Sequence, residues 1–200
     1  MIKTIIFDIG NVLTGFYLRE FIQSKGYDDA MTSRIEKATL FTPVWGELDR
    51  GKWTTEEIID GFVANDPEIE TDLRKTFANI KGMLHRFDYA IPWIKELKSK
   101  GYTVLYLSNF NRPAHEQCAE ALDFLPYMDG GILSYQDLVI KPEPEIYRLL
   151  IERYHLIPEE CVFLDDLQAN LDGAAAFGIH TILFKNQQDA IKQLKKLGVE

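Results

Sequence analysis

The fold of this chain is decided by its opening residues, Ile2-Lys3-Thr4-Ile5-Ile6-Phe7-Asp8-Ile9-Gly10-Asn11. Residues 2–7 form a short run rich in β-branched side chains, and the polar residues from Asp8 onward end it. A brief apolar run that stops at turn-forming residues is typical of a buried β-strand. We therefore predict a strand over residues 2–7, with Asp8 directly beyond its end.

Helical periodicity dominates the residues that follow. Between about residues 16 and 87, apolar side chains recur at the spacing of helix faces, and turn signals at Gly26, at Gly46 and Gly51, and at Asp66-Pro67 separate the stripes. Thr54, with glutamates in the turn after it, marks a helix start. We find no convincing strand pattern in this part of the sequence. An all-helical insertion over residues 16–87 is therefore predicted.

Strands and helices alternate after residue 88. Their short connections predict a parallel sheet covered by helices on both faces. The fold class is thus α/β, with a Rossmann-like core built from residues 1–15 and 88–200 and the helical insertion between these two parts. The expected helices are residues 90–100, 113–122, 143–154, 168–177 and 187–197, and the expected strands are residues 103–107, 131–133, 161–164 and 180–184.

Composition limits the partners and the compartment. The 200 residues include 31 Asp and Glu against 22 Lys and Arg, and the net charge of −9 argues against nucleic acid or an anionic membrane as a main partner. Cys118 and Cys161 are isolated, so neither a disulfide framework nor a common zinc motif is predicted. No apolar run reaches the roughly 18 residues of a membrane-spanning helix. We expect a cytoplasmic protein, whose oligomeric state the sequence does not indicate.

Polar side chains follow several of the expected strands. Asp8 follows the first strand, Ser108 and Asn109 follow the second, and the Asp165-Asp166 pair follows a later one. The carboxyl ends of parallel strands meet at one edge of a sheet, where ligands bind. Carboxylates hold hard divalent cations, a lysine such as Lys141 supplies positive charge to phosphate, and a carboxylate can attack phosphorus. This edge therefore suits a phosphate together with Mg²⁺.

Each of these residues also has a purely structural interpretation. Asp8 alone suits a turn, the polar pairs after the later strands suit helix caps, and Lys141 suits solvent. However, the adjacent carboxylates of Asp165 and Asp166 repel one another in the absence of a cation. The coincidence of so many such groups on one edge favours the functional interpretation.

The same segments resemble a known family. In order along the chain they are similar to the four motifs of the haloacid dehalogenase (HAD) superfamily, and the helical insertion is similar to its cap domain. Residues 8–12 and 108–112 look most like the branch of α-D-glucose-1-phosphate phosphatase-like proteins. The four segments are Phe7–Leu13, Leu107–Asn109, Lys141–Pro142 and Phe163–Asp166.

The resemblance implies a Mg²⁺-dependent phosphatase and assigns a metal site. Asp8 is implied as the nucleophile that forms an aspartyl phosphate and as a metal ligand. The Gly10 carbonyl and Asp166 are implied as further ligands. Asp165 is implied as a ligand through water or as an orienting residue, and Asn170, one helical turn beyond, would orient the two aspartates.

The resemblance also implies a phosphate site. Ser108 and the Asn109 amide would hold the phosphoryl oxygens, and Lys141 would neutralise charge between the phosphate and Asp8. The implied partner is a small phosphorylated metabolite, with a sugar phosphate as one candidate.

Gly10 departs from the family pattern. Phosphatases of the family usually carry a second aspartate at this position, as general acid and then general base, a contribution worth roughly 10² to 10⁴ in rate. We expect leaving groups that need little protonation to suffer least, and Glu47 or Asp49 is a candidate replacement. The alternative is a catalytically weak or inactive protein that binds phosphate or a partner. A dehalogenase, a phosphomutase and a receiver domain fit the residues less well.

The cap is expected to select the substrate, because in the family it closes over the core site. Residues 45–53, rich in glycine and charge, are interpreted as a substrate-facing loop. Asn111 and Arg112 either reach the substrate or cap the next helix. The candidate cap residues are Phe16, Tyr17, Trp45, Glu47, Asp49, Arg50 and Trp53.

Overall fold

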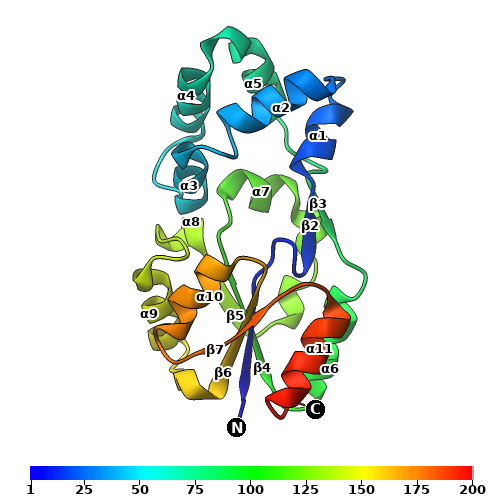
Figure 1. Ribbon diagram of the computed structural model, residues 1–200, viewed down its shortest axis with the longest axis vertical. Coiled ribbons are helices and arrows are strands. Elements are labelled where there is room, and N and C mark those ends of the chain that lie inside the picture. Colours follow the sequence, from blue (N-terminus) through cyan, green and yellow to red (C-terminus); the bar gives the residue numbers. More distant parts are fainter. Residues whose placement is uncertain (200) are drawn as a thin grey trace.

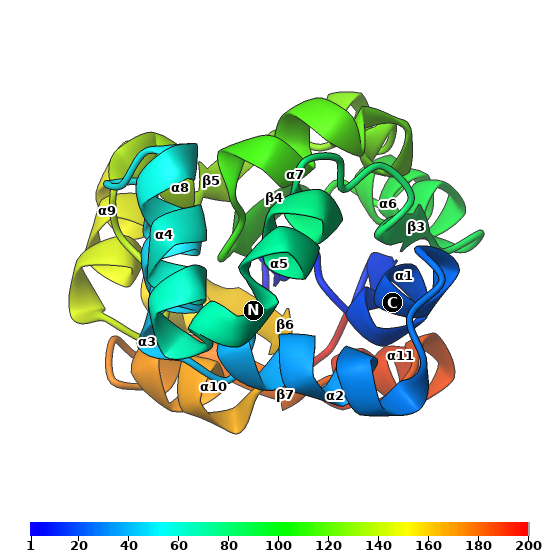
Figure 2. The ribbon, with the colours of Figure 1, turned by 90° about the horizontal axis from the view of Figure 1, so that it is seen from above.

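An α/β core and a smaller helical cap lie one above the other, and both chain ends lie at the far end of the core (Figure 1). The computed structural model describes residues 1–199. Seen from above, the cap helices lie over the core (Figure 2). Within residues 1–199, no helix has the length and apolar character needed to cross a membrane.

The core is built on a five-stranded sheet in the order β5-β4-β1-β6-β7, with every strand pair parallel. The predicted α/β fold class is therefore confirmed. The observed strands agree closely with the expected ones, and the central position of β1 explains its uninterrupted burial. The strands are β1 (Thr4–Phe7), β4 (Thr103–Ser108), β5 (Gly130–Leu133), β6 (Cys161–Asp165) and β7 (His180–Leu183).

Alternate side chains of each strand point to opposite faces of the sheet. Ile5 and Phe7 pack in the cluster that contains Trp93 of α6 (Ala90–Ser99), whereas Ile6 packs in a second cluster with Tyr147. Helices therefore cover both faces, as predicted. The second cluster is covered by α9 (Pro144–Arg153) and α10 (Gln168–Ala175), and the first also packs against α11 (Gln187–Lys196).

One expected core helix is interrupted. Residues 113–122 form α7 (Arg112–Gln117) and a separate 3₁₀ turn, η2 (Ala119–Leu122), because Cys118 leaves helical geometry between them. The thiol of Cys118 donates a hydrogen bond to the carbonyl of Ile80. Two further 3₁₀ turns, η3 (Leu125–Tyr127) and η4 (Pro158–Glu160), and a short helix, α8 (Ser134–Asp137), complete the core.

The cap consists mainly of helices. The predicted start at Thr54 is confirmed, because Thr54 and Glu57 form a capping box in which each side chain accepts a hydrogen bond from the other's backbone N–H. The cap helices are α1 (Leu18–Ser24), α2 (Asp29–Ala38), α3 (Pro43–Arg50), α4 (Thr55–Asn65), the 3₁₀ turn η1 (Pro67–Ile69) and α5 (Glu70–Phe77).

The prediction of an all-helical insertion is wrong, because two short strands lie at the base of the cap. β2 (Thr14–Phe16) and β3 (Leu84–Arg86) pair antiparallel where the chain enters and leaves the cap. Each strand has only three residues, which is too short for an alternating pattern to be recognised in the sequence. The boundaries at residues 15 and 88 remain predictions.

The predicted loop over residues 45–53 is also wrong, because α3 occupies most of it. Pro43 stands at the first turn of this helix, and Gly51 ends it in the left-handed conformation with φ of 76°. Gly46 costs a helix interior about 1 kcal/mol relative to alanine. Trp45 and Leu48 of α3 pack against the main hydrophobic cluster and offset this cost.

Candidate active site

The sheet brings the predicted site residues to one edge. Phe7 pairs with Leu164 of β6, so Asp8 and Asp165 follow side by side, and Ser108 ends the neighbouring strand β4. A cavity of about 510 Å³ lies between this edge and the cap, and we call it the edge cavity. Its core side is lined by Asp8, Gly10, Asn11, Ser108, Asn109, Lys141, Asp166 and Asn170.

Lys141 forms the centre of the site. Its side chain is only 1% exposed, and its Nζ lies 3.0 Å from Asp8 Oδ1 and 2.6 Å from Asp165 Oδ2. Burial disfavours the charged amine, but these two carboxylates outweigh it and raise the pKa of Lys141 above its ordinary value. Lys141 is therefore a buried cation that links two of the strand ends.

The side chain of Asn109 positions the backbone of Lys141. Asn109 Oδ1 accepts from the Lys141 N–H at 2.7 Å, and Asn109 Nδ2 donates to the Lys141 carbonyl at 2.9 Å. The side-chain amide is thus engaged with the loop that carries the lysine. Any contact of Asn109 with a phosphoryl group is left to its backbone N–H.

Asp165 is fully buried and surrounded by donors. Besides Lys141, Asn170 Nδ2 lies 3.0 Å from each of its carboxylate oxygens, and the Leu167 N–H donates to Oδ1 at 2.8 Å. Asn170 is itself fixed, because its carbonyl accepts from the Tyr147 hydroxyl at 2.7 Å. The predicted link between Asn170 and the aspartates is thus present on Asp165.

Asp166 is half-buried and faces the edge cavity. Asn11 Nδ2 donates to its Oδ2 at 3.0 Å, and burial raises the pKa of Asp166 against this hydrogen bond. Asn11 has a φ of 56°, a left-handed conformation that asparagine tolerates better than most residues. Sequence reasoning gave Asn11 no role, although an asparagine in a turn after a strand is a signal for this conformation.

Three carboxylates converge at this edge. Oxygens of Asp8, Asp165 and Asp166 all lie within 4.8 Å of one another. Burial raises the pKa of Asp8 to about 7, although Lys141 and a hydrogen bond from Ser108 lower it. A cluster of carboxylates with one lysine retains excess negative charge, and oxygen ligands of this kind suit a hard divalent cation. The donor set therefore fits Mg²⁺.

Gly10 leaves open space in the site. A Cβ atom built on Gly10 would meet nothing within 4 Å, and Gly10 is not one of the glycines with positive φ. Neither a neighbouring side chain nor backbone strain therefore requires glycine here. Position 10 therefore supplies no side chain that could act as an acid or base, as the sequence indicated.

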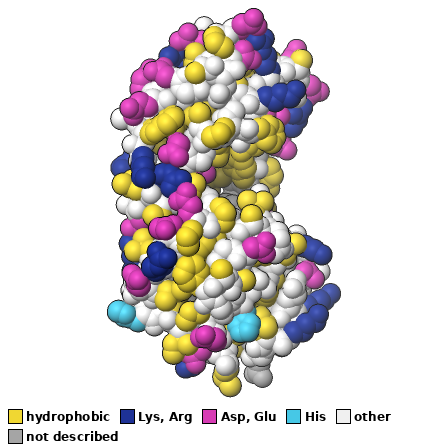
Figure 3. All heavy atoms as spheres, turned by 60° about the vertical axis from the view of Figure 1, so that its left-hand side comes forward, with side chains coloured by type: hydrophobic (Ala, Val, Ile, Leu, Met, Phe, Trp, Pro, Cys, Tyr) yellow, Lys and Arg dark blue, Asp and Glu magenta, His cyan; other side chains and the backbone are white. Residues whose placement is uncertain are grey.

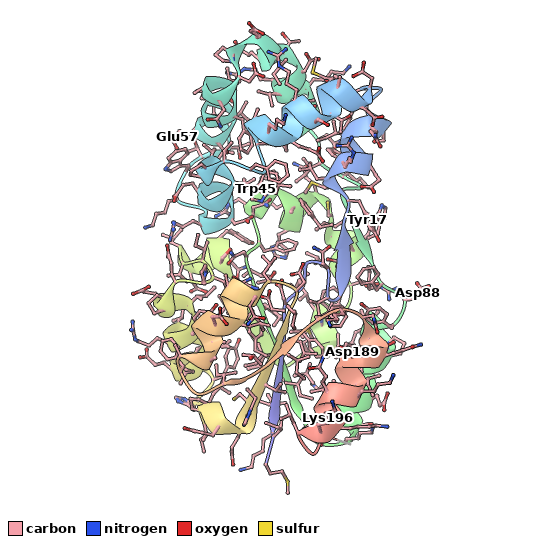
Figure 4. All side chains as sticks on the ribbon, viewed as in Figure 1. Tyr17, Trp45, Glu57, Asp88, Asp189 and Lys196 are labelled. Atoms are coloured by element: carbon pink, nitrogen blue, oxygen red, sulfur yellow. The ribbon has the colours of Figure 1, made fainter. Side chains whose placement is uncertain are left out.

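The cap side of the edge cavity is mostly apolar. Of the seven candidate cap residues, Phe16, Trp45 and Asp49 line the cavity, and Tyr17, Glu47, Arg50 and Trp53 do not. Trp45 lies between the cap helices and α7 (Figure 4), and hydrophobic side chains gather on the cap side of the hollow at the waist (Figure 3). Sequence reasoning missed the lining residues Leu40, Thr42, Met83, Leu84, Ile140 and Leu167.

Asn111 caps the next helix, as one of its two predicted roles requires, and it lines the edge cavity, whereas Arg112 does not. A contact of Asn111 with the substrate stays a prediction. Asn111 Oδ1 accepts from the Ala114 N–H at 2.9 Å and caps α7, while its Nδ2 donates to Asp49 Oδ1 at 3.0 Å. The Arg112 guanidinium lies over the ring of Tyr135, 5.3 Å from its centroid.

Comparison with known proteins agrees with this architecture. A D-ribitol-5-phosphate phosphatase from Bacteroides thetaiotaomicron is 30% identical over 206 residues, which cover 97% of each protein. Mouse acyl-CoA dehydrogenase family member 10 is 27% identical over 98% of this chain, but the chain spans only 19% of that protein.

A crystal structure has the same fold. It is a HAD family enzyme from Bacteroides thetaiotaomicron in complex with magnesium and inorganic phosphate, with a TM-score of 0.69 at 24% identity over 92% of this chain and 95% of that one. The sequence model of the family of haloacid dehalogenase-like hydrolases matches residues 2–178 of this chain. The finer branch of glucose-1-phosphate phosphatase-like proteins stays a prediction. The family resemblance is confirmed: the chain belongs to the haloacid dehalogenase-like hydrolases.

Proposed function

We propose that this chain is a Mg²⁺-dependent phosphatase that hydrolyses a small phosphomonoester through an aspartyl phosphate on Asp8. The observation that carries the proposal is the buried contact of Lys141 with both Asp8 and Asp165 at the floor of the edge cavity. A silent site has no physical need for a buried lysine between carboxylates, because desolvating these charges is costly. The similarity to a named phosphatase supports the same reaction.

The residues that would hold Mg²⁺ are Asp8, Asp166 and the carbonyl of Gly10. Asp165 is already engaged by Lys141 and Asn170, which favours an orienting role or a contact through water. When bound, the ion would supply positive charge to the phosphoryl oxygens.

Asp8 is held in a fixed orientation for attack. Its Oδ1 accepts from the Ile9 N–H at 2.7 Å and lies 3.0 Å from the Lys141 amine. The carboxylate attacks phosphorus, a P–O bond to Asp8 forms, and the P–O bond to the leaving alcohol breaks. Lys141, Ser108 and the Asn109 backbone N–H would stabilise the phosphoryl charge, and this stabilisation is the main part of phosphoryl-transfer catalysis.

The apolar cap wall favours a leaving group with apolar surface. The Thr42 hydroxyl of the cap donates to the Thr39 carbonyl at 2.7 Å, and the Asn111 side chain of the core, which faces the cap, is engaged with Ala114 and Asp49. A polyol would leave hydroxyls unpaired against this wall, at about 1 to 3 kcal/mol for each buried group. We therefore expect aryl and short alkyl phosphates to have a higher kcat/KM than the predicted sugar phosphates.

A phosphate-release assay over phosphorylated metabolites, with and without Mg²⁺, tests the proposal. Asp8→Asn should lower metal-dependent release by at least about 10⁴-fold, as loss of a nucleophile does in other enzymes. Asp172→Asn is the matched control, because Asp172 is exposed on α10 and contacts Gln168. Release by the wild type that does not exceed the Asp8→Asn level, even with aryl phosphates, would favour the alternative of a binding protein.

A further inference from the structure

We propose that Asp49, on the cap helix α3, is the general acid and base of the reaction, in place of the aspartate that Gly10 lacks. This inference rests on the proposed phosphatase function. It assigns the proton transfers to the cap, whereas the nucleophile and the phosphate site belong to the core.

The position of Asp49 supports this role. Asp49 lies in the last turn of α3 and lines the edge cavity together with Asp8, Ser108 and Lys141. It does not belong to the carboxylate cluster of Asp8, Asp165 and Asp166, so it is not placed as a metal ligand. It therefore faces the cavity from the side where the leaving group must depart.

Two core residues fix the orientation of Asp49. Asn111 Nδ2 donates to Asp49 Oδ1 at 3.0 Å, and the Ser134 hydroxyl donates to the Asp49 carbonyl at 2.5 Å. These contacts hold one carboxylate oxygen and the backbone. They leave Oδ2 as the oxygen that can exchange a proton with the substrate.

The other cap carboxylate considered, Glu47, is not suitable. Glu47 is paired with Arg50 at 3.2 Å, and it does not line the edge cavity. Arg50 in turn forms a bidentate ion pair with Glu143, in which each of two guanidinium nitrogens lies 2.7 Å from a carboxylate oxygen. Glu47 and Arg50, the charged residues that flank Asp49 on α3, are thus engaged in ion pairs that do not include Asp49.

Asp49 itself has no cation of its own among residues 1–199. None of the ion pairs in this part of the chain includes it. Lys141 lowers the pKa of Asp49 through its charge, but Lys141 already contacts Asp8 and Asp165. Burial beside the apolar wall raises the pKa of Asp49 to about 6, against the effects of Asn111 and Lys141. A carboxyl group in this range can both donate and accept a proton near neutral pH.

The two chemical steps then balance. In the first, ionised Asp8 attacks phosphorus while protonated Asp49 gives its proton to the departing oxygen, and the products are the alcohol, the aspartyl phosphate and ionised Asp49. In the second, ionised Asp49 takes a proton from water as the water oxygen attacks phosphorus. The P–O bond to Asp8 breaks, which yields inorganic phosphate, ionised Asp8 and protonated Asp49.

Pre-steady-state kinetics of Asp49→Asn with Mg²⁺ tests this role. Asparagine keeps the acceptor oxygen for Asn111 but carries no acidic proton. p-Nitrophenyl phosphate has a leaving group that departs without protonation, whereas benzyl phosphate has one that needs it. The variant should release about one equivalent of p-nitrophenol in a burst near the wild-type rate, followed by turnover slowed by about 10² to 10⁴. With benzyl phosphate the burst should be absent.

Controls separate this role from a structural one. Glu47→Gln makes the same chemical change two residues away and should keep both rates within about twofold. Asp49→Ser, checked for its melting temperature, should show the same burst. Equal losses on both substrates without a burst, or no loss, would overturn the inference while leaving the phosphatase intact. Wild-type protein that forms no phenol above the Asp8→Asn level would overturn the proposed function and the inference together.

Discussion

The core and the cap place their charges in opposite ways. In the core, charged side chains at the strand ends are buried and contact one another, as in the pairs that Lys141 forms with Asp8 and Asp165. In the cap, the charges lie mainly on the outer surface, where Arg34 and Arg74 contact exposed carboxylates, and the wall of the edge cavity is apolar apart from a few groups. The difference agrees with the proposal that the core carries the phosphate chemistry and that the cap selects and protonates the leaving group.

The largest expected effect concerns the buried charge of the core. Lys141→Met leaves Asp8 and Asp165 without a cation, and the free energy of unfolding at pH 7 should fall by about 3 to 5 kcal/mol. Lys98→Met is the matched control, because it removes a half-exposed pair with Asp129 and should cost about 1 kcal/mol or less. Urea unfolding of both variants measures the difference. Similar losses would show that the core pair is no more important than a surface pair.

The next effect concerns the metal. Asp166→Asn removes a ligand charge from the carboxylate cluster, so the Mg²⁺ concentration for half-maximal phosphate release should rise by about 10²-fold or more. A Mg²⁺ titration of phosphate release by the variant measures this. Asp172→Asn should leave the requirement unchanged. An unchanged Mg²⁺ dependence in Asp166→Asn would remove Asp166 from the metal site.

A smaller effect concerns the stability cost of the cap carboxylate. The pKa of Asp49 is raised from 3.8 to about 6 on folding, so the folded protein binds the proton more tightly than the unfolded chain. As the pH rises from about 4 to about 6, the free energy of unfolding of the wild type should therefore fall by about 1 to 3 kcal/mol relative to that of Asp49→Asn. Urea unfolding of both proteins across this range gives the difference, and a difference independent of pH would contradict the pKa shift.

The smallest effect moves the acid from the cap to the core. The space beside Gly10 can accept a side chain. The double variant Gly10→Asp with Asp49→Asn should therefore turn over benzyl phosphate about tenfold faster than Asp49→Asn alone. Gly10→Asn in the same background has similar size but no acidic proton. If the two variants behave alike, the gain does not come from proton transfer.

The core was more predictable from the sequence than the cap. The alternation of strands and helices fixes which residues reach the carboxyl edge, so Asp8, Ser108 and Asp165 were found from their positions alone. The role of the Asn109 side chain was not found, because its contact with the Lys141 backbone depends on how two loops meet in space.

The cap depended on tertiary packing that no local pattern records. Gly46 made α3 look like a loop, although packing of the partly buried Trp45 and Leu48 against the main hydrophobic cluster stabilises the helix. Asp49 was only one of two candidate carboxylates, and its selection required the contacts with Asn111 and Ser134. Sequence reasoning identifies residues that a sheet edge must gather, but not the face that a helix turns toward the site.

Trapping the phosphoryl group tests directly whether Asp8 carries it. We would mix Asp49→Asn with p-nitrophenyl phosphate and Mg²⁺, quench with acid after the burst, and map the modified peptide by mass spectrometry. We expect a Mg²⁺-dependent phosphoryl group on Asp8 that hydroxylamine removes. A phosphoryl group on another residue, or phosphate release with no modified Asp8, would contradict it.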